Sequence, residues 1–149
     1  MIIDQLHTSD ISELMPLLLE ADPSIASIKS YVDASAIFAA SENEKVIGVA
    51  VVQIGAHEAE IKNIAVVKEF RGRGIGRALL AHLRDYAAQK MIKKITVGTG
   101  NSSLYQLRFY QLSGFRIVAV EKDYFDQYPN PIYEDGIRCR DLLRLEIIL

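Results

Sequence analysis

Three arginines and three glycines alternate within residues 71–77, where the sequence reads R-G-R-G-I-G-R. The segment follows a run of β-forming residues and precedes the apolar spacing of an amphipathic helix. Glycine lets the backbone adopt positive φ, and a helix N-terminus presents backbone N–H groups that bind anions. The arginines add positive charge at the same place. These residues therefore predict a corner that binds a phosphate-bearing ligand.

Two common phosphate-binding motifs do not fit this corner. A nucleotide P-loop requires Lys and then Ser or Thr after its last glycine, and no such pair follows Gly76. A dinucleotide fingerprint has the spacing G-x-G-x-x-G, whereas Gly72, Gly74 and Gly76 are spaced G-x-G-x-G. A tight turn without a ligand is the structural alternative, and the flanking arginines argue against it.

The elements that must position this corner follow from periodicity and turn signals. We expect seven strands, at residues 2–6, 37–40, 46–54, 58–67, 93–97, 115–120 and 142–148. We expect four helices, at residues 10–21, 22–32, 75–90 and 104–114. Asp10 with Glu13 and Asp22 with Pro23 are the predicted starts of the first two, and Gly114 is the predicted cap that ends the fourth. This order predicts a mixed α/β (α+β) fold, with helices on both sides of a central, mostly antiparallel sheet.

Length and composition limit the class of protein. A chain of 149 residues fits a single domain, 1–149. The net charge of −2 gives no basis for nucleic-acid binding. Cys139 is the single cysteine, so no intramolecular disulfide forms. The sequence shows no signal peptide and no membrane-spanning run, and we expect a cytoplasmic protein without membrane or nucleic-acid partners.

Two motifs together carry a family resemblance. R-G-R-G-I-G resembles the [R/Q]-x-x-G-x-[G/A] motif of the GNAT superfamily of acyl-CoA-dependent acyltransferases. F-Y-Q-L-S-G-F resembles the family's later Y-x-x-x-G-F segment, with Tyr110, Gly114 and Phe115 at the matching positions. The segments G-T-G-N-S-S and G-I-R-C-R-D are similar to a bacterial YvbK-like subgroup of that family. The resemblance is firm over residues 37–120 and looser elsewhere.

The resemblance implies acetyl-CoA as the cosubstrate and no metal. Strand backbone would pair with the pantetheine arm, the amides of residues 72–77 would hold the diphosphate, and a distortion near Val66 would expose a backbone donor. Ser103 stands where relatives often carry a pantetheine-contacting Asn, and Asn101 lies two residues earlier. The cofactor-binding residues so implied are Ile64, Ala65, Val66, Arg71, Gly72, Arg73, Gly74, Ile75, Gly76, Arg77, Asn101 and Ser103.

Two side chains are the expected catalytic residues. The resemblance implies that Tyr110 protonates the departing thiolate; the alternative is a core aromatic residue. An ammonium must lose a proton before it attacks. Glu60 is the leading candidate for the base, because its strand resembles the base-bearing strand of the family. The alternative for Glu60 is an ion pair with Lys62, and His57 and Glu58 are weaker candidates. We expect Cys139 to pack rather than react, because direct transfer needs no acyl-enzyme.

The predicted function is an N-acetyltransferase that moves an acetyl group from acetyl-CoA to a primary amine by direct attack in a ternary complex. The alternative is a non-catalytic acyl-CoA-binding regulatory module on the same fold. The acceptor stays open between a small-molecule and a protein amine. The loop at 123–142, with its acidic and aromatic residues, forms either a wall of the acceptor pocket or a packed connection. A homodimer is also left open.

Overall fold

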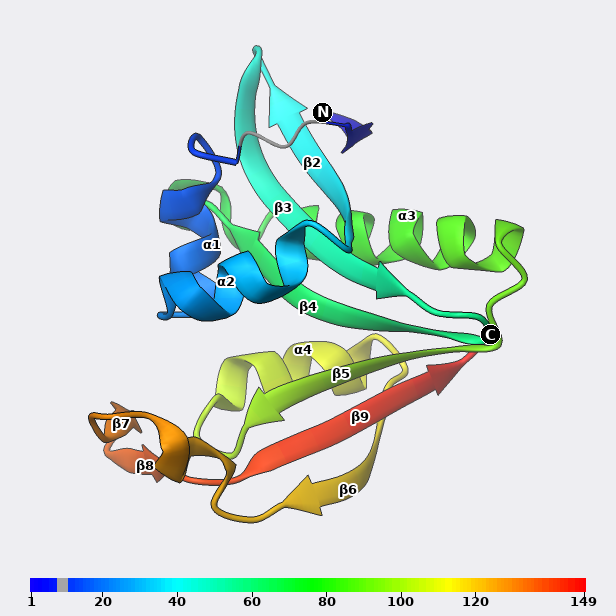
Figure 1. Ribbon diagram of the computed structural model, residues 1–149. Coiled ribbons are helices and arrows are strands. Elements are labelled where there is room, and N and C mark those ends of the chain that lie inside the picture. The colour runs from blue at the N-terminus through cyan, green and yellow to red at the C-terminus, as the bar shows by residue number, and fades with distance from the viewer. Residues whose placement is uncertain (8–10) are drawn as a thin grey trace. The chain divides into compact units, whose positions relative to one another are not determined.

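The computed structural model describes residues 1–7 and 11–149 (Figure 1). The chain divides into two compact units, Met1–Lys93 with Leu149 and Lys94–Ile148. The single domain expected for residues 1–149 stays a prediction. Within the described part of the chain, no helix is long and apolar enough to cross a membrane.

Four antiparallel strands form the sheet of the first unit. They lie in the order β1 (Ile2–Leu6), β2 (Ala36–Glu42), β3 (Lys45–Ile54) and β4 (Glu58–Val66). Strands β2 and β3 are runs of small and β-branched residues, which suit a sheet buried on both faces. The positive φ of Asn43 and Glu44 makes the tight turn between these two strands. The predicted three-strand meander is confirmed.

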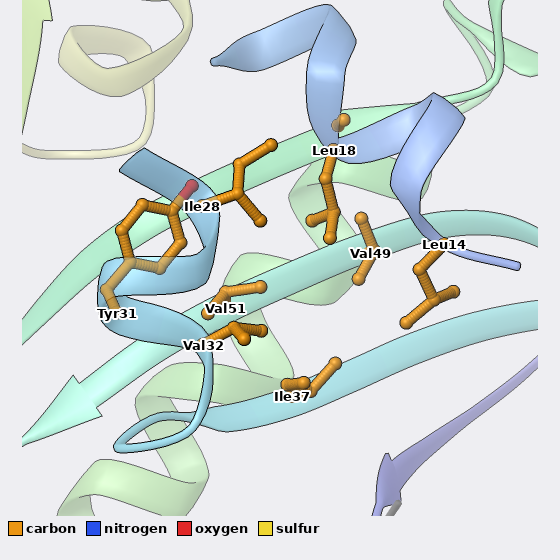
Figure 2. Packing of buried hydrophobic residues seen from close by; sticks show 9 residues of the cluster. Leu14, Leu18, Ile28, Tyr31, Val32, Ile37, Val49 and Val51 are labelled. Atoms are coloured by element: carbon orange, nitrogen blue, oxygen red, sulfur yellow. The ribbon is translucent and has the colours of Figure 1, made fainter. Parts of the chain in front are cut away.

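Helices cover both faces of this sheet. Helices α1 (Met15–Ala21) and α2 (Ile25–Val32) pack on the face that carries Ile37, Val49 and Val51, as Figure 2 shows. Helix α3 (Ile75–Gln89) packs on the other face, where His82 and Tyr86 contact the ring of Phe38 edge-on. Because Ile37 and Phe38 are adjacent in β2, their side chains point to opposite faces. The core of the unit therefore has two layers.

The starts of the first two helices differ from the predictions. The predicted cap Asp10 lies outside the described residues, and α1 begins at Met15 with no side-chain cap. The predicted cap Asp22 is not the cap of α2. Ser24 is, because its Oγ accepts a hydrogen bond from the Ser27 N–H at 3.1 Å. Asp22 instead accepts hydrogen bonds from the Ser24 N–H and the Ser27 hydroxyl.

Strand β4 contains a bulge. Val51 pairs with Asn63 and the adjacent Val52 pairs with Ile61, so Lys62 has no partner on β3. The resemblance implies a distortion of this strand that exposes a backbone donor near Val66, and that donor stays a prediction. The irregularity in the pairing of β4 with β3 lies at Lys62. An extra residue reverses the alternation of side chains.

The second unit is built on three antiparallel strands, in the order β5 (Lys94–Gly100), β9 (Leu142–Ile148) and β6 (Arg116–Glu121). Helix α4 (Leu104–Leu112) is followed by Ser113 and then by Gly114, which has φ of +99° as its predicted capping role requires. The loop after β6 holds a short 3₁₀ helix, Tyr124–Gln127, and a hairpin of β7 (Ile132–Glu134) and β8 (Ile137–Cys139). The sequence did not predict this hairpin.

The fold class is confirmed. The described residues contain the four predicted α-helices and the seven predicted strands, together with the additional hairpin. Strand β9 has the predicted bounds, and β5 extends to Gly100, three residues beyond the predicted end at residue 97.

Candidate functional site

Two of the three glycines of the corner between β4 and α3 have the positive φ that the sequence predicts, whereas Gly76 lies within α3 and does not. After β4 the chain makes one 3₁₀ turn, Lys68–Phe70, and then reaches Gly72 with φ of +78° and Gly74 with φ of +83°. A Cβ atom placed on either glycine would meet nothing within 4 Å. The two glycines are therefore required by backbone conformation rather than by packing, and the space in front of them is open.

The first amides of α3 lack internal partners. The Ala78 N–H donates to the Gly74 carbonyl at 2.9 Å, which is the first hydrogen bond of the helix. The amides of Ile75, Gly76 and Arg77 precede that bond. No side chain among the described residues caps this end, and the first turn carries no acidic residue. An anion at this position would meet several N–H groups and the positive end of the helix dipole.

The arginines of the corner have different surroundings. Arg71 Nε donates to the Val66 carbonyl at 3.0 Å, and its guanidinium forms an ion pair with Glu20 at 2.9 Å. Its side chain therefore connects α1, the end of β4 and the corner. The guanidinium of Arg73 lies 5.0 Å from the ring centre of Phe70. Arg77 is exposed at the start of α3.

Gly48 on β3 fixes how closely α3 approaches the sheet. A Cβ on Gly48 would lie 3.0 Å from Ile75 Cγ2 and 3.1 Å from Leu79 Cδ1. Ile75 and Leu79 are buried in the first turns of α3. The missing side chain lets the N-terminus of the helix, and with it the corner, lie directly on β3.

Strand β4 carries the other predicted residues of this unit. Ile64, Ala65 and Val66 pair along one edge with β3, opposite Ala50, Val49 and Gly48. The side chain of Glu60 is partly exposed, and its Oε1 lies 3.0 Å from Lys62 Nζ. The ion pair that the sequence offered as an alternative to catalysis is thus present, and it does not exclude a role as base.

The bulge decides which side chains share a face of the sheet. Glu60 lies opposite Gln53, and Asn63 lies opposite Val51. Gln53 and Val51 are two residues apart on β3, so Glu60 and Asn63 share the face that α1 and α2 cover. In a regular strand without a bulge, these two side chains, which are three residues apart, would point to opposite faces.

Asn63 is a buried polar residue beside the candidate site that the sequence analysis missed. Only 4% of it is exposed, and its Nδ2 donates to the Leu18 carbonyl at 2.9 Å and to the Tyr31 hydroxyl at 3.2 Å. The Tyr31 hydroxyl in turn donates to Asp22 at 3.2 Å. The buried Oδ1 of Asn63 has no partner among the described residues. An asparagine inside an apolar strand, where this residue type is rare, was the available signal.

Tyr110 lies in the core of the second unit. It is 3% exposed and sits between the rings of Phe109 and Phe115, with ring centres 5.2 Å and 5.5 Å away. Burial raises the pKa of the Tyr110 hydroxyl well above its ordinary value, because the apolar surroundings disfavour the phenolate. The hydroxyl is therefore fully protonated at neutral pH and can donate a hydrogen bond.

Asn101 and Ser103 are hydrogen bonded to the segment that contains the hairpin. Asn101 Nδ2 donates to the Arg138 carbonyl at 3.1 Å, and its Oδ1 accepts from the N–H groups of Arg140 and Asp141. The Ser103 hydroxyl donates to Glu134 at 2.8 Å. Asn101 and Ser103, the two residues predicted to contact the pantetheine, therefore already form hydrogen bonds within this unit.

Cys139 packs as the sequence predicts. It is buried, and burial is the main cause that raises the pKa of its thiol. A Cβ on Gly100 would lie 2.5 Å from its Sγ. Among the described residues, no group of three or more His, Cys, Asp or Glu side chains is placed to hold a metal ion.

Comparisons with known proteins agree with the motifs. The acetyltransferase (GNAT) family model matches residues 6–115. The chain is 38% identical to the uncharacterized N-acetyltransferase YvbK of Bacillus subtilis (strain 168), over 92% of this chain and 90% of that protein. It is 28% identical to the [ribosomal protein bS18]-alanine N-acetyltransferase of Escherichia coli (strain K12), over 59% of this chain and 60% of that protein.

A solved structure gives the same result at the level of the fold. The chain resembles a GNAT family acetyltransferase from Elizabethkingia anophelis with acetyl-CoA bound, at a TM-score of 0.93 and 41% identity. The match covers 99% of this chain and 97% of that one. The likeness therefore extends beyond the two motifs to nearly the whole chain.

Proposed function

The chain belongs to the acetyltransferase (GNAT) family, as an acetyl-CoA-dependent N-acyltransferase of the YvbK type, and from this premise we propose a substrate class and a mechanism. The enzyme transfers the acetyl group of acetyl-CoA to a primary amine, which attacks the thioester directly in a ternary complex. The acceptor is a small-molecule or a protein amine. The cytoplasmic location expected from the sequence stays a prediction.

The corner between β4 and α3 holds the diphosphate of the cosubstrate. Left-handed Gly72 and Gly74, the open space before them and the uncapped start of α3 support this role. Arg73 and Arg77 add positive charge at the exposed surface, whereas Arg71 holds the corner to Val66 and Glu20. Of all the observations, the combination of an uncapped helix start with two left-handed, unobstructed glycines carries the proposal.

The remaining carrier contacts extend from the corner along β4. The backbone of Ile64, Ala65 and Val66 binds the pantetheine arm, with Asn101 or Ser103 as a further contact. The hydrogen bonds that Asn101 and Ser103 already make imply that these side chains contribute by holding their loop in place.

Glu60 acts as the base that removes a proton from the acceptor. A lysine-like amine has a pKa near 10.4, so it reaches the enzyme as an ammonium and must be deprotonated before attack. A carboxylate on the face of the sheet that α1 and α2 cover supports this role. Lys62 is its ion-pair partner, and the acceptor ammonium would compete with Lys62 for the carboxylate.

Tyr110 assists departure of the thiol. Attack on the thioester leads to a thiolate, and an ordinary thiol has a pKa near 8.5. Because the pKa of Tyr110 is raised, its neutral hydroxyl donates a hydrogen bond to the developing sulfur anion more readily than it gives up its proton completely. Tyr110 is thus a positioned hydrogen-bond donor in the step that breaks the carbon–sulfur bond.

A thiol-release assay with acetyl-CoA and a panel of polyamines, amino acids, aminoglycosides and peptide N-termini tests the proposed function. We expect amine-dependent release, and Glu60→Gln should abolish the acidic limb of the pH–rate profile. Lys62→Gln is the matched control, because it breaks the same ion pair and leaves the carboxylate. Thiol release that no amine stimulates, or an unchanged acidic limb in Glu60→Gln, would contradict the proposed chemistry.

A further inference from the structure

Strand β6 is the edge strand of the sheet in the second unit. It pairs with β9 on one side, and among the described residues no strand pairs with its other side (Figure 1, gold strand beside red β9). All six of its residues are exposed. Its outward N–H and C=O groups are therefore available to another strand.

The exposed side chains of this edge are apolar. Ile117, Val118 and Val120 are 46%, 53% and 52% exposed. Natural edge strands are often protected by a charge or a proline in the middle of the strand. In R-I-V-A-V-E the charges stand at the two ends only. The centre of β6 is thus an apolar edge without these protections.

The sequence of β6 is complementary to itself. In an antiparallel, two-fold pairing centred between Val118 and Ala119, Arg116 faces Glu121 of the second copy, and Ile117 faces Val120 of the second copy. Opposite charges at both ends and apolar pairs between them are the pattern of an isologous interface. We propose that β6 pairs with β6 of a second copy of this chain and forms a homodimer.

Charges on the neighbouring strands support this register. Lys94 on β5 forms an ion pair with Glu146 on β9 at 3.3 Å, and Glu146 lies opposite Arg116 in the pairing of β6 with β9. The proposed pairing continues this alternation of charge to Glu121 of the second copy. Within its own chain Glu121 accepts a hydrogen bond from Arg144 at 2.9 Å, and a carboxylate has room for a second donor.

The bulge in β6 limits the strength of the dimer. The register of β6 on β9 shifts between Ile117 and Ala119, so Val118 has no partner on β9. Bulges are one way in which edges avoid pairing. Here the bulge leaves two extended segments, 116–117 and 120–121. The two-fold axis places each segment opposite the other segment of the second copy. Because six residues make a small interface, we expect a dissociation constant on the order of 10 µM.

Sedimentation equilibrium of the whole chain, from about 1 µM to about 1 mM, tests the proposal. Arg116→Glu places like charges at both ends of the pairing, and so does Glu121→Lys. We expect each variant alone to dimerise at least about tenfold more weakly than the wild type. A mixture of the two restores opposite charges at both ends, so the heterodimer should form with nearly wild-type affinity. Arg84→Glu, on the exposed face of α3, is the matched control and should not change dimerisation.

The mixture distinguishes a change at this interface from a loss of folding or of activity in the single variants. Circular dichroism and thiol release should be unchanged in both variants, because neither residue belongs to the proposed catalytic or binding site. A wild type that stays monomeric at all concentrations would overturn the proposal. So would single variants that dimerise normally, or a mixture that gains no affinity over its components. Failure of the acetyl-transfer chemistry would leave these results unaffected.

Discussion

Two strand-to-helix junctions in this molecule contain a G-x-G pair, yet the two pairs have opposite environments. Gly72 and Gly74 lie in the connection that leads into α3, whereas Gly98 and Gly100 lie at the end of β5, before residues 101–103 lead into α4. Gly72 and Gly74 have left-handed φ and open space before them. A Cβ on Gly98 would lie 3.1 Å from Leu142, and one on Gly100 would lie 2.5 Å from Cys139 Sγ.

Glycine has a different structural role in each of these junctions. Before α3, glycine turns backbone amides toward an open surface, which suits a ligand. Before α4, glycine makes room for neighbouring side chains, and Asn101 uses its carboxamide to hold the segment that follows β8. Both junctions carry two glycines in the same G-x-G spacing, and only φ and the surrounding contacts distinguish an open junction from a packed one.

The largest expected effect follows from Gly74→Ala. A non-glycine residue in the left-handed region costs about 1 kcal/mol, and its Cβ would project into the space that the diphosphate needs. We expect kcat/KM for acetyl-CoA to fall by about a hundredfold or more, a loss of about 2.7 kcal/mol in transition-state binding. Steady-state kinetics with varied acetyl-CoA measures this loss.

The matched control for this variant is Gly136→Ala in the β7–β8 turn. Gly136 has φ of +77° and equally open space, so backbone strain is the same in both variants. Gly136→Ala should lower stability by a similar amount and leave kcat/KM for acetyl-CoA unchanged. Equal losses of kcat/KM in the two variants would show that backbone strain alone explains the effect of Gly74→Ala.

The next largest effect is expected from Tyr110→Phe. Loss of the hydroxyl should lower kcat by about tenfold to a hundredfold and leave the affinity for acetyl-CoA unchanged. Because burial raises the pKa of Tyr110 above about 10, the hydroxyl stays protonated and the ratio of wild-type to variant kcat should be constant from about pH 6 to about pH 9. Isothermal titration calorimetry and pH-dependent turnover measure the two parts; a ratio that varies across this range would require another role for Tyr110.

Gly100→Ala should affect stability rather than ligand binding. The new Cβ would overlap Cys139 Sγ, and overpacking of this kind costs about 1–3 kcal/mol. Chemical denaturation should show this loss, and adding Cys139→Ala should recover most of it, because the clashing sulfur is then absent. If Gly100→Ala instead weakened the affinity for acetyl-CoA without lowering stability, the junction before α4 would also be part of the binding site.

The smallest effect is expected from Glu20→Gln. The ion pair of Glu20 with Arg71 is exposed, and such pairs contribute about 0–1 kcal/mol. Arg71 keeps its hydrogen bond to the Val66 carbonyl, so the corner should stay in place. We expect changes below about 0.5 kcal/mol in stability and below about twofold in kcat/KM for acetyl-CoA. A tenfold kinetic loss would show that Glu20 holds Arg71 in a geometry the ligand needs.

Local patterns predicted most of the fold from the sequence. Strand β1 and strand β9 have the expected bounds because their apolar residues lie between clear turn signals. The predicted start of α2 was wrong. Asp22 and Ser24 are both good capping residues, and only the side-chain contacts in the folded chain decide between them. The β7–β8 hairpin was missed because its strands are three residues each, too short for a periodic pattern.

The site was predictable where it depends on local chemistry. Gly72 and Gly74 could be assigned to the corner because positive φ is a property of glycine itself. The bulge at Lys62 and the burial of Asn63 depend on how β4 pairs with β3 and on what α1 and α2 place over it. Such contacts join residues distant in sequence, and no local pattern encodes them.

Amide hydrogen exchange with and without acetyl-CoA tests whether the corner before α3 binds the diphosphate. If this corner binds the diphosphate, the amides of residues 72–77 should exchange at least about tenfold more slowly in the presence of acetyl-CoA. The turn amide of Gly136, equally left-handed and open, should exchange at an unchanged rate. Saturating acetyl-CoA that leaves residues 72–77 as fast as before would contradict the account.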